Sequence, residues 1–198
     1  MSPFEPLWLA LWGAQALYLF APLMVSAALA GLFLRYDWLP GWSRPLDGQA
    51  TFRGQRVLGD GKTWRGTLIA ISGSSLTVAL QRALQESIPR AIQVVDYAAI
   101  HPIALGTSLG LGAILGELPN SFVKRQLRIP RGKTTHGSLG VVFYVWDQVD
   151  TLIGAWPLLC VWFTPRVPLV IMSFALTLGL HPLLAWLGYL AGARRSAR

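Results

Sequence analysis

Charged residues are scarce in this chain. They make up 13% of its 198 residues, whereas a soluble globular domain carries about 25%. This deficit excludes an ordinary soluble fold and predicts an integral membrane protein, and 53% of the residues are hydrophobic. The length allows a few membrane-spanning helices, and we expect residues 1–198 to form a single domain.

Cysteine is nearly absent. The single Cys160 excludes a disulfide framework, and because it lies in an apolar run we expect its thiol to be buried and inert. The first six residues also lack the positive charge that begins a signal peptide. We therefore expect the first apolar stretch to be retained as a helix.

Five apolar stretches predict an all-α bundle of about five transmembrane helices. The expected spans are about residues 7–34, 66–82, 97–118, 141–163 and 167–191, separated on one side by loops of about 35–65 and 119–140. The third span contains two pairs of glycines at four-residue spacing, Gly106 with Gly110 and Gly112 with Gly116. Small residues at this spacing let membrane helices approach closely.

The basic residues predict how the bundle is oriented. Of the 17 Lys and Arg residues, six lie in residues 35–65, five in the loop that follows Glu117 and three in the C-terminal tail. Cytoplasmic loops carry the excess of Lys and Arg, so the N-terminus is expected outside and the C-terminus in the cytoplasm. Both long loops then share the cytoplasmic face and can build one site. The sequence has no basic face interleaved with aromatic residues, the pattern that would indicate nucleic-acid binding.

Three carboxylates flank the second loop at the ends of apolar stretches: Glu117, Asp147 and Asp150. Carboxylates in such places are costly without a partner. Asp147 and Asp150 are three residues apart, so one helical face presents both. Mg²⁺ binds through carboxylates and substrate phosphates, which predicts a magnesium site. The alternative is a set of structural salt bridges to Lys124 or Arg125.

Ser121, Lys124 and Arg125 lie at positions i, i+3 and i+4, so a helix would present them on one face. A hydroxyl with two cations forms a suitable cradle for phosphate. The alternative is a solvated basic helix beside the membrane. Further along this loop, Lys133 continues the basic run and His136 could contact phosphate or be a bystander.

The first loop ends in Lys62, Thr63 and Arg65 after a glycine-rich turn. Exposed backbone N–H groups and two cations at the start of a helix favour anion binding. The alternative is a basic stop at the membrane surface with Trp64 as an interfacial anchor.

These motifs resemble a known family. The pattern Ser121-x-x-Lys124-Arg125, His136-Gly137 and Asp147-x-x-Asp150 resembles the signature of the phosphatidate cytidylyltransferases, the CDP-diacylglycerol synthases. The five-span architecture, the Lys62-Thr63-Trp64-Arg65-Gly66 motif and the form Asp147-Gln148-x-Asp150 look more like the CDP-archaeol synthases. The resemblance covers about residues 7–190, with its specific motifs in 56–66 and 116–150.

The resemblance implies Mg²⁺-dependent transfer of CMP from CTP to the phosphate of a membrane lipid, with release of pyrophosphate. The lipid would be an archaeal-type ether lipid phosphate or phosphatidate, and the enzyme would lie in the cell membrane with its site at the cytoplasmic face. Glu117, Asp147 and Asp150 would hold metal, and Lys124 would act with the two aspartates in catalysis. CTP or phosphate would be bound by Lys62, Thr63, Arg65, Ser121, Lys124, Arg125, Lys133 and His136.

Three features separate this chain from the archaeal pattern or leave alternatives open. Glu117 stands where Asp is usual, and residues 131–145 form a longer loop. The chain also resembles bacterial members, so the lipid acceptor is open.

Alternative readings are an inactive scaffold of the same fold or an anion transporter. The sequence does not fix the oligomeric state, and a homodimer is one option. A CDP-alcohol phosphotransferase is disfavoured, because Asp60-Gly61 is not continued by its Asp-Gly-x-x-Ala-Arg pattern.

Overall fold

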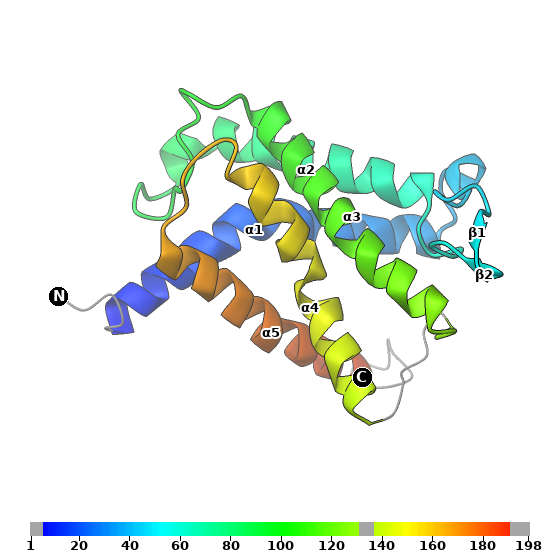
Figure 1. Ribbon diagram of the computed structural model, residues 1–198. Coiled ribbons are helices and arrows are strands. Elements are labelled where there is room, and N and C mark those ends of the chain that lie inside the picture. The colour runs from blue at the N-terminus through cyan, green and yellow to red at the C-terminus, as the bar shows by residue number, and fades with distance from the viewer. Residues whose placement is uncertain (1–5, 131–136, 191–198) are drawn as a thin grey trace.

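The computed structural model describes residues 6–130 and 137–190, with side chains in the last helix up to Gly179. Figure 1 shows its five α-helices: α1 (Pro6–Arg35), α2 (Trp64–Ala83), α3 (Pro102–Gln126), α4 (Ser138–Leu159) and α5 (Val167–Leu190). Two 3₁₀ turns, Pro40–Trp42 and Gln85–Ser87, lie in the connections. A hairpin of β1 (Thr51–Phe52) and β2 (Gln55–Arg56) follows α1.

The predicted helical bundle is confirmed, with the small hairpin as an addition that the sequence reading lacked. In the described part of the chain, α1 and α3 are long and apolar enough to cross a membrane. The number of crossings and the orientation with the N-terminus outside stay predictions.

Helix α3 differs most from its expected range of 97–118. It begins at Pro102 because the preceding His101 is extended, as residues before proline are, with φ −67° and ψ 123°. It also continues past Pro119 to Gln126, beyond the expected end at residue 118. Membrane helices accommodate an internal proline when neighbouring helices support them, and α3 packs against both α2 and α4. Asn120 and Lys124 therefore lie on α3 and not in the loop that was expected there.

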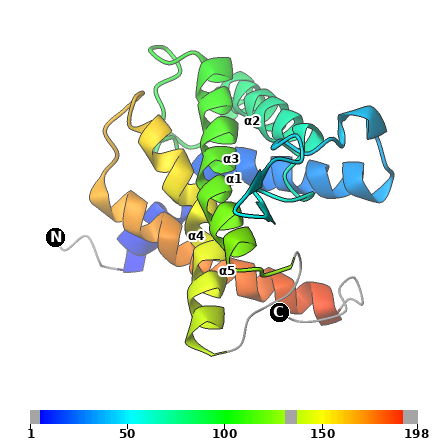
Figure 2. The same ribbon diagram turned by 45° about the vertical axis from the view of Figure 1, so that its right-hand side comes forward.

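Glycines let α3 lie close to its two neighbours, between which it passes in Figure 2. A methyl group on Gly106 or Gly110 would collide with the backbone of α2. A methyl group on Gly116 would collide with the carbonyl oxygen of Asp150 on α4, and one on Gly154 would collide with the backbone of α3. The backbones of α3 and α4 therefore meet directly beside Asp150, which places the ends of these helices relative to one another.

We expect Gly116→Ala to destabilise the bundle, because α3 and α4 must separate to accept the methyl group. Overpacking of this kind costs about 1–3 kcal/mol. Gly13→Ala in α1 is the matched control, since nothing lies within 4 Å of its added methyl group. The measurement is the thermal unfolding midpoint in detergent. A midpoint for Gly116→Ala equal to that of Gly13→Ala would contradict this packing.

One expectation about the core was wrong. Cys160 is exposed on the protein surface rather than buried. Helix α4 ends at Leu159, which is fully buried, and Cys160 is the cap residue that follows it. The side chains of adjacent residues at the end of a helix point in different directions. The burial of Leu159 therefore does not require Cys160 to be buried as well.

Candidate active site

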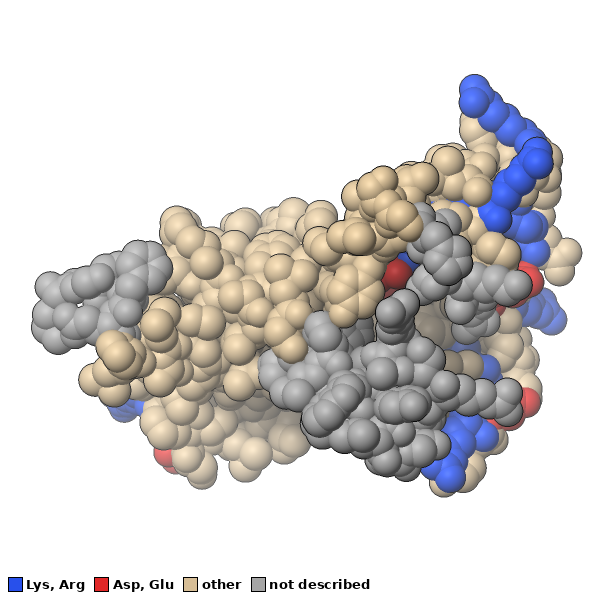
Figure 3. All heavy atoms as spheres, turned by 90° about the horizontal axis from the view of Figure 1, so that it is seen from below, with Lys and Arg blue, Asp and Glu red and all other residues tan. Residues whose placement is uncertain are grey.

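On the face shown in Figure 3, most of the charged side chains lie toward one end, and residues of other types cover much of the rest. Helices α3 and α4 bring the predicted carboxylates to this end, and the loop before α2 brings Lys62 to them. Residues from α3, from α4 and from the loop before α2 therefore meet in one cluster, which consists of Lys62, Glu117, Asn120, Lys124, Asp147, Asp150 and Thr151. We refer to these residues as the carboxylate cluster.

Asn120 connects the two aspartates. Its Nδ2 donates to Oδ1 of Asp147 at 2.6 Å and to Oδ2 of Asp150 at 2.8 Å. Asp150 is 6% exposed and also accepts from the backbone N–H of Thr151 at 2.7 Å. Asn120 was not singled out from the sequence as a site residue. It lies three residues after Glu117 and four before Lys124. A helix predicted to continue beyond Pro119 would therefore have placed all three side chains on one face.

Two lysines neutralise the outer carboxylates. Lys62 forms an ion pair with Glu117, and Lys124 forms one with Asp147. The hydroxyl of Thr151 donates to Oε1 of Glu117 at 3.4 Å. The pair of Lys124 with Asp147 is one that the salt-bridge alternative named, whereas Arg125 pairs with neither aspartate in the described part of the chain. Lys62 and Lys124 were also expected to bind phosphate, so an arriving polyphosphate would compete with the carboxylates for them.

Asp47 organises the loop that carries Lys62. Its carboxylate, 2% exposed, accepts from the backbone N–H groups of Leu58 at 2.9 Å and Gly59 at 3.2 Å and from Arg56 at 2.9 Å. Burial alone would raise the pKa of Asp47, but these hydrogen bonds outweigh it and lower the pKa to about 2. The loop thus closes around a permanently charged carboxylate. Sequence reasoning did not single out Asp47.

We expect Asp47→Asn to open this loop at neutral pH. A carboxylate whose folded pKa lies below its ordinary value contributes stability above that value, here about 2 kcal/mol, and loses it as pH falls from about 4 to 2. The measurement is hydrogen exchange of the Leu58 and Gly59 amides at pH 7, which should quicken about 30-fold. Asp60→Asn is the control, because Asp60 is 76% exposed. Unchanged protection in Asp47→Asn would contradict the role of the charge.

The other predicted residues lie outside the carboxylate cluster. Thr63 caps α2, accepting from the N–H of Gly66 at 3.2 Å. Arg65 is buried and donates to Asp37 at 2.8 Å and to the carbonyl of Trp38 at 2.9 Å. The structure therefore does not bring Arg65 to the carboxylates, although it lies three residues from Lys62.

Arg125 and Ser121 also lie on α3 and outside the carboxylate cluster. Arg125 donates to the carbonyl of Ile129 and lies against Gly59, so it contacts the loop rather than the carboxylates. Ser121 is half-buried. Lys133 and His136 lie outside the described residues.

The donor set suits a hard divalent cation. It consists of carboxylate oxygens, together with Oδ1 of Asn120, which is buried and has no hydrogen-bond partner among the described residues. Oxygen-only ligands are those that Mg²⁺ prefers. In the described part of the chain, no three acidic, histidine or cysteine side chains are grouped so that they could hold a metal. The donor types fit Mg²⁺, but their arrangement in this structure is not that of a metal site.

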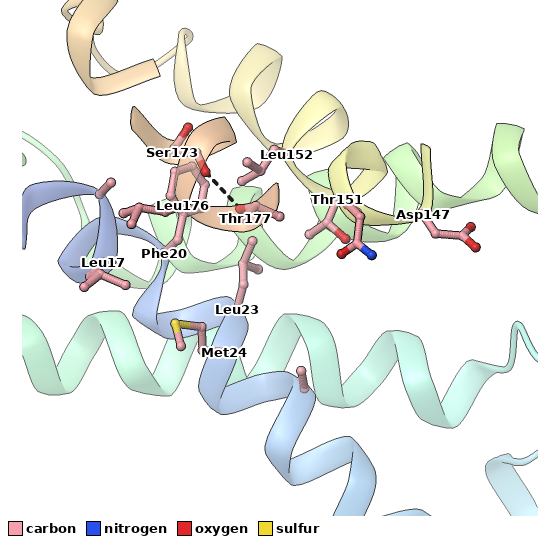
Figure 4. Close-up of a pocket in the computed structure, with 13 residues that line it drawn as sticks. Leu17, Phe20, Leu23, Met24, Asp147, Thr151, Leu152, Ser173, Leu176 and Thr177 are labelled. Carbon is pink, nitrogen blue, oxygen red and sulfur yellow. Dashed lines mark hydrogen bonds between the residues drawn. The ribbon is translucent and has the colours of Figure 1, made fainter. Parts of the chain in front are cut away.

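An apolar cavity of about 340 Å³ opens beside the carboxylate cluster. Figure 4 shows Asp147 and Thr151 at one end of it and Leu17, Phe20 and Leu176 toward the other. Its walls come from α1, α4 and α5. A polar end next to charged groups and a long apolar remainder match the shape of an amphiphile.

This arrangement is that of an intramembrane enzyme of lipid synthesis. A solved structure described as an intramembrane enzyme for archaeal membrane lipid biosynthesis matches with a TM-score of 0.61 and 26% identity, over 85% of this chain and 91% of that one. The family model of the CarS-like CDP-archaeol synthases matches residues 14–195. The chain belongs to this family.

Curated relatives give the same result. The CDP-archaeol synthase of Halobacterium salinarum is 37% identical over 163 residues, which cover 79% of this chain and 84% of that protein. The CDP-archaeol synthase of Natronomonas pharaonis is 31% identical over 173 residues, covering 79% and 85%. The resemblance drawn from the motifs is thereby confirmed, and the chain is a membrane enzyme of the cytidylyltransferase class.

Proposed function

We propose that the protein transfers CMP from CTP to the phosphate of a membrane lipid, giving a CDP-lipid and pyrophosphate. The observation that carries this proposal is the position of the carboxylate cluster, with its two lysines, at the polar end of an apolar cavity. A nucleoside triphosphate matches the cations, and a lipid matches the cavity. Family membership supports the same substrates.

The reaction needs no nucleophile from the protein. An oxygen of the lipid phosphate attacks the α-phosphorus of CTP, a new P–O bond forms, and the bond to the β-phosphate oxygen breaks to release pyrophosphate. The protein contributes positioning and charge neutralisation. Lys62 and Lys124 exchange their carboxylate partners for phosphate oxygens of CTP, while Asn120 keeps Asp147 and Asp150 side by side.

We infer that the reaction depends on Mg²⁺ held by Glu117, Asp147 and Asp150, with the free oxygen of Asn120 beside them. When bound there, Mg²⁺ would supply positive charge to the phosphates. The lysines released from their carboxylates would then be available to CTP. Ser121 and Arg125 lie near the C-terminal end of α3 and are proposed to extend the phosphate site. Lys133 and His136, which lie outside the described residues, are proposed to do the same.

The site is proposed to lie at the cytoplasmic face of the cell membrane, because the basic residues of the two long loops favour that side. There CTP from the cytoplasm meets a lipid head group from the bilayer. A multi-pass bundle of five crossings, with the N-terminus outside, follows from the same distribution. Homodimer formation also stays a proposal.

The proposal is tested with purified protein in detergent, CTP, Mg²⁺ and a panel of acceptors. The panel contains phosphatidate, an unsaturated ether lipid phosphate with geranylgeranyl chains, and its saturated analogue. We expect CDP-lipid with at least one acceptor and none when Mg²⁺ is replaced by EDTA. Failure with every acceptor would favour the inactive scaffold. Product with phosphatidate alone would remove the ether-lipid assignment.

A further inference from the structure

Gln148 is a buried amide whose oxygen meets no donor among the described residues. It lies on α4 between Asp147 and Asp150, is 8% exposed, and lines the apolar cavity. Its Oε1 is buried and has no hydrogen-bond partner within the described part of the chain. That oxygen is an acceptor, and the N–H groups of the same amide are donors for a ligand in the cavity.

The other polar side chains deeper in the cavity already have partners. Ser173 accepts from Nε1 of Trp156 at 3.0 Å and donates to the carbonyl of Val170 at 2.7 Å. Thr177 donates to the carbonyl of Ser173 at 2.9 Å. These hydroxyls fold back onto their own helix and leave the cavity wall apolar. Gln148 is therefore distinguished from them by an amide that is free to meet a ligand.

The position of Gln148 on α4 defines which part of a ligand it would meet. Asp147, the preceding residue, belongs to the carboxylate cluster, whereas Leu152, one turn further on the same face as Gln148, lies in the apolar wall. An amphiphile whose charged group lies at the cluster would place the atoms between its head and its chains beside Gln148. In a glycerol-based lipid phosphate those atoms are oxygen acceptors, and an amide N–H is a donor.

We propose that Gln148 recognises the acceptor lipid, donating a hydrogen bond from its amide to an oxygen of the phosphoglycerol head. This inference rests on the proposed function for the identity of the ligand. Phosphate oxygens and the oxygens that link the chains to glycerol share this acceptor chemistry. The role is one of binding and selection: Gln148 holds the head group at the boundary between the cluster and the apolar wall, and it takes no part in bond making.

The test is binding of a dialkylglycerol phosphate to the protein in detergent, measured without turnover. Gln148→Met keeps the length of the side chain and removes both hydrogen-bonding groups. We expect Kd for the lipid phosphate to rise about tenfold, as for loss of one hydrogen bond to a charged or polar group. Kd for CTP should stay within about twofold. Thr177→Val is the matched control, because Thr177 lines the same cavity but is bonded to its own helix.

Three results would overturn the inference: unchanged lipid binding in Gln148→Met, an equal loss in Thr177→Val, or an equal loss of CTP binding, which would mark a structural role. Repeating the binding with diacylglycerol phosphate and with glycerol 1-phosphate distinguishes the oxygens. A loss common to all three ligands places the bond on phosphate, and a loss that differs between ester and ether lipids places it on the glycerol linkage. Because binding is read directly, a wild-type protein that binds lipid but makes no CDP-lipid contradicts the proposed function alone.

Discussion

Asp150→Asn is expected to reduce turnover by roughly 10³-fold while the protein stays folded. Asn has nearly the shape of Asp and can still accept from Asn120, so the contact between α3 and α4 is preserved. What is lost is one negative charge at the centre of the carboxylate cluster, where Asp150 is buried. The proposed reaction depends on that charge to hold Mg²⁺ beside the triphosphate. The measurement is kcat with saturating CTP and lipid.

Asp60→Asn is the matched control, since it removes an exposed carboxylate from the adjoining loop. We expect it to retain wild-type turnover within about twofold, as surface substitutions usually do. The unfolding midpoint of each variant in detergent confirms that both are folded. Turnover near the wild-type level in folded Asp150→Asn would remove Asp150 from the metal site and from the proposed chemistry.

Lys62→Met is expected to lower kcat/KM for CTP by about 10²-fold. Lys62 pairs with Glu117, and we propose that it moves to a phosphate of CTP when the nucleotide binds. Met preserves the apolar stem of lysine and removes its charge, so the interaction with phosphate is lost in both the ground state and the transition state. The loss should therefore be visible chiefly in KM for CTP, and kcat should fall only to the extent that Lys62 binds the transition state more strongly than bound CTP.

The control for this variant is Arg44→Met, which removes an exposed positive charge from the same loop. If the cluster acts through a specific contact, Arg44→Met should keep its KM for CTP within about twofold. An equal loss in both variants would mean that the loop acts through its overall charge. Normal kinetics in Lys62→Met would show that Glu117 is its only partner during the reaction.

The helical bundle was predictable because its signals are local. Apolar stretches locate all five helices, and four-residue glycine spacing in α3 anticipates its close contacts. The end of α3 was not predictable in the same way. Pro119 is a local signal to stop, but the support that overrides it comes from packing against α4, on which Asp150 lies. Tertiary contacts thus decided the one boundary that matters most for the site.

The carboxylate cluster was predictable in part for the same reason. The sequence shows Glu117, Asp147 and Asp150 as acids in apolar surroundings. The free-energy cost of a charge in such surroundings indicates that each of them needs a partner. Asn120 carries no charge and so gave no comparable signal, although it joins the two aspartates. Lys62 and Arg65 were equivalent in the sequence. Only the folded chain shows that one meets Glu117 and the other Asp37.

The most direct test of the central claim is the fate of labelled phosphorus in CTP. Wild-type protein is incubated with Mg²⁺, the accepted lipid phosphate, and CTP labelled with ³²P at either the α or the γ position. Transfer of CMP predicts that the α label enters the lipid fraction and that the γ label is released as pyrophosphate. Entry of the γ label into lipid, or no lipid label from either nucleotide, would contradict the account.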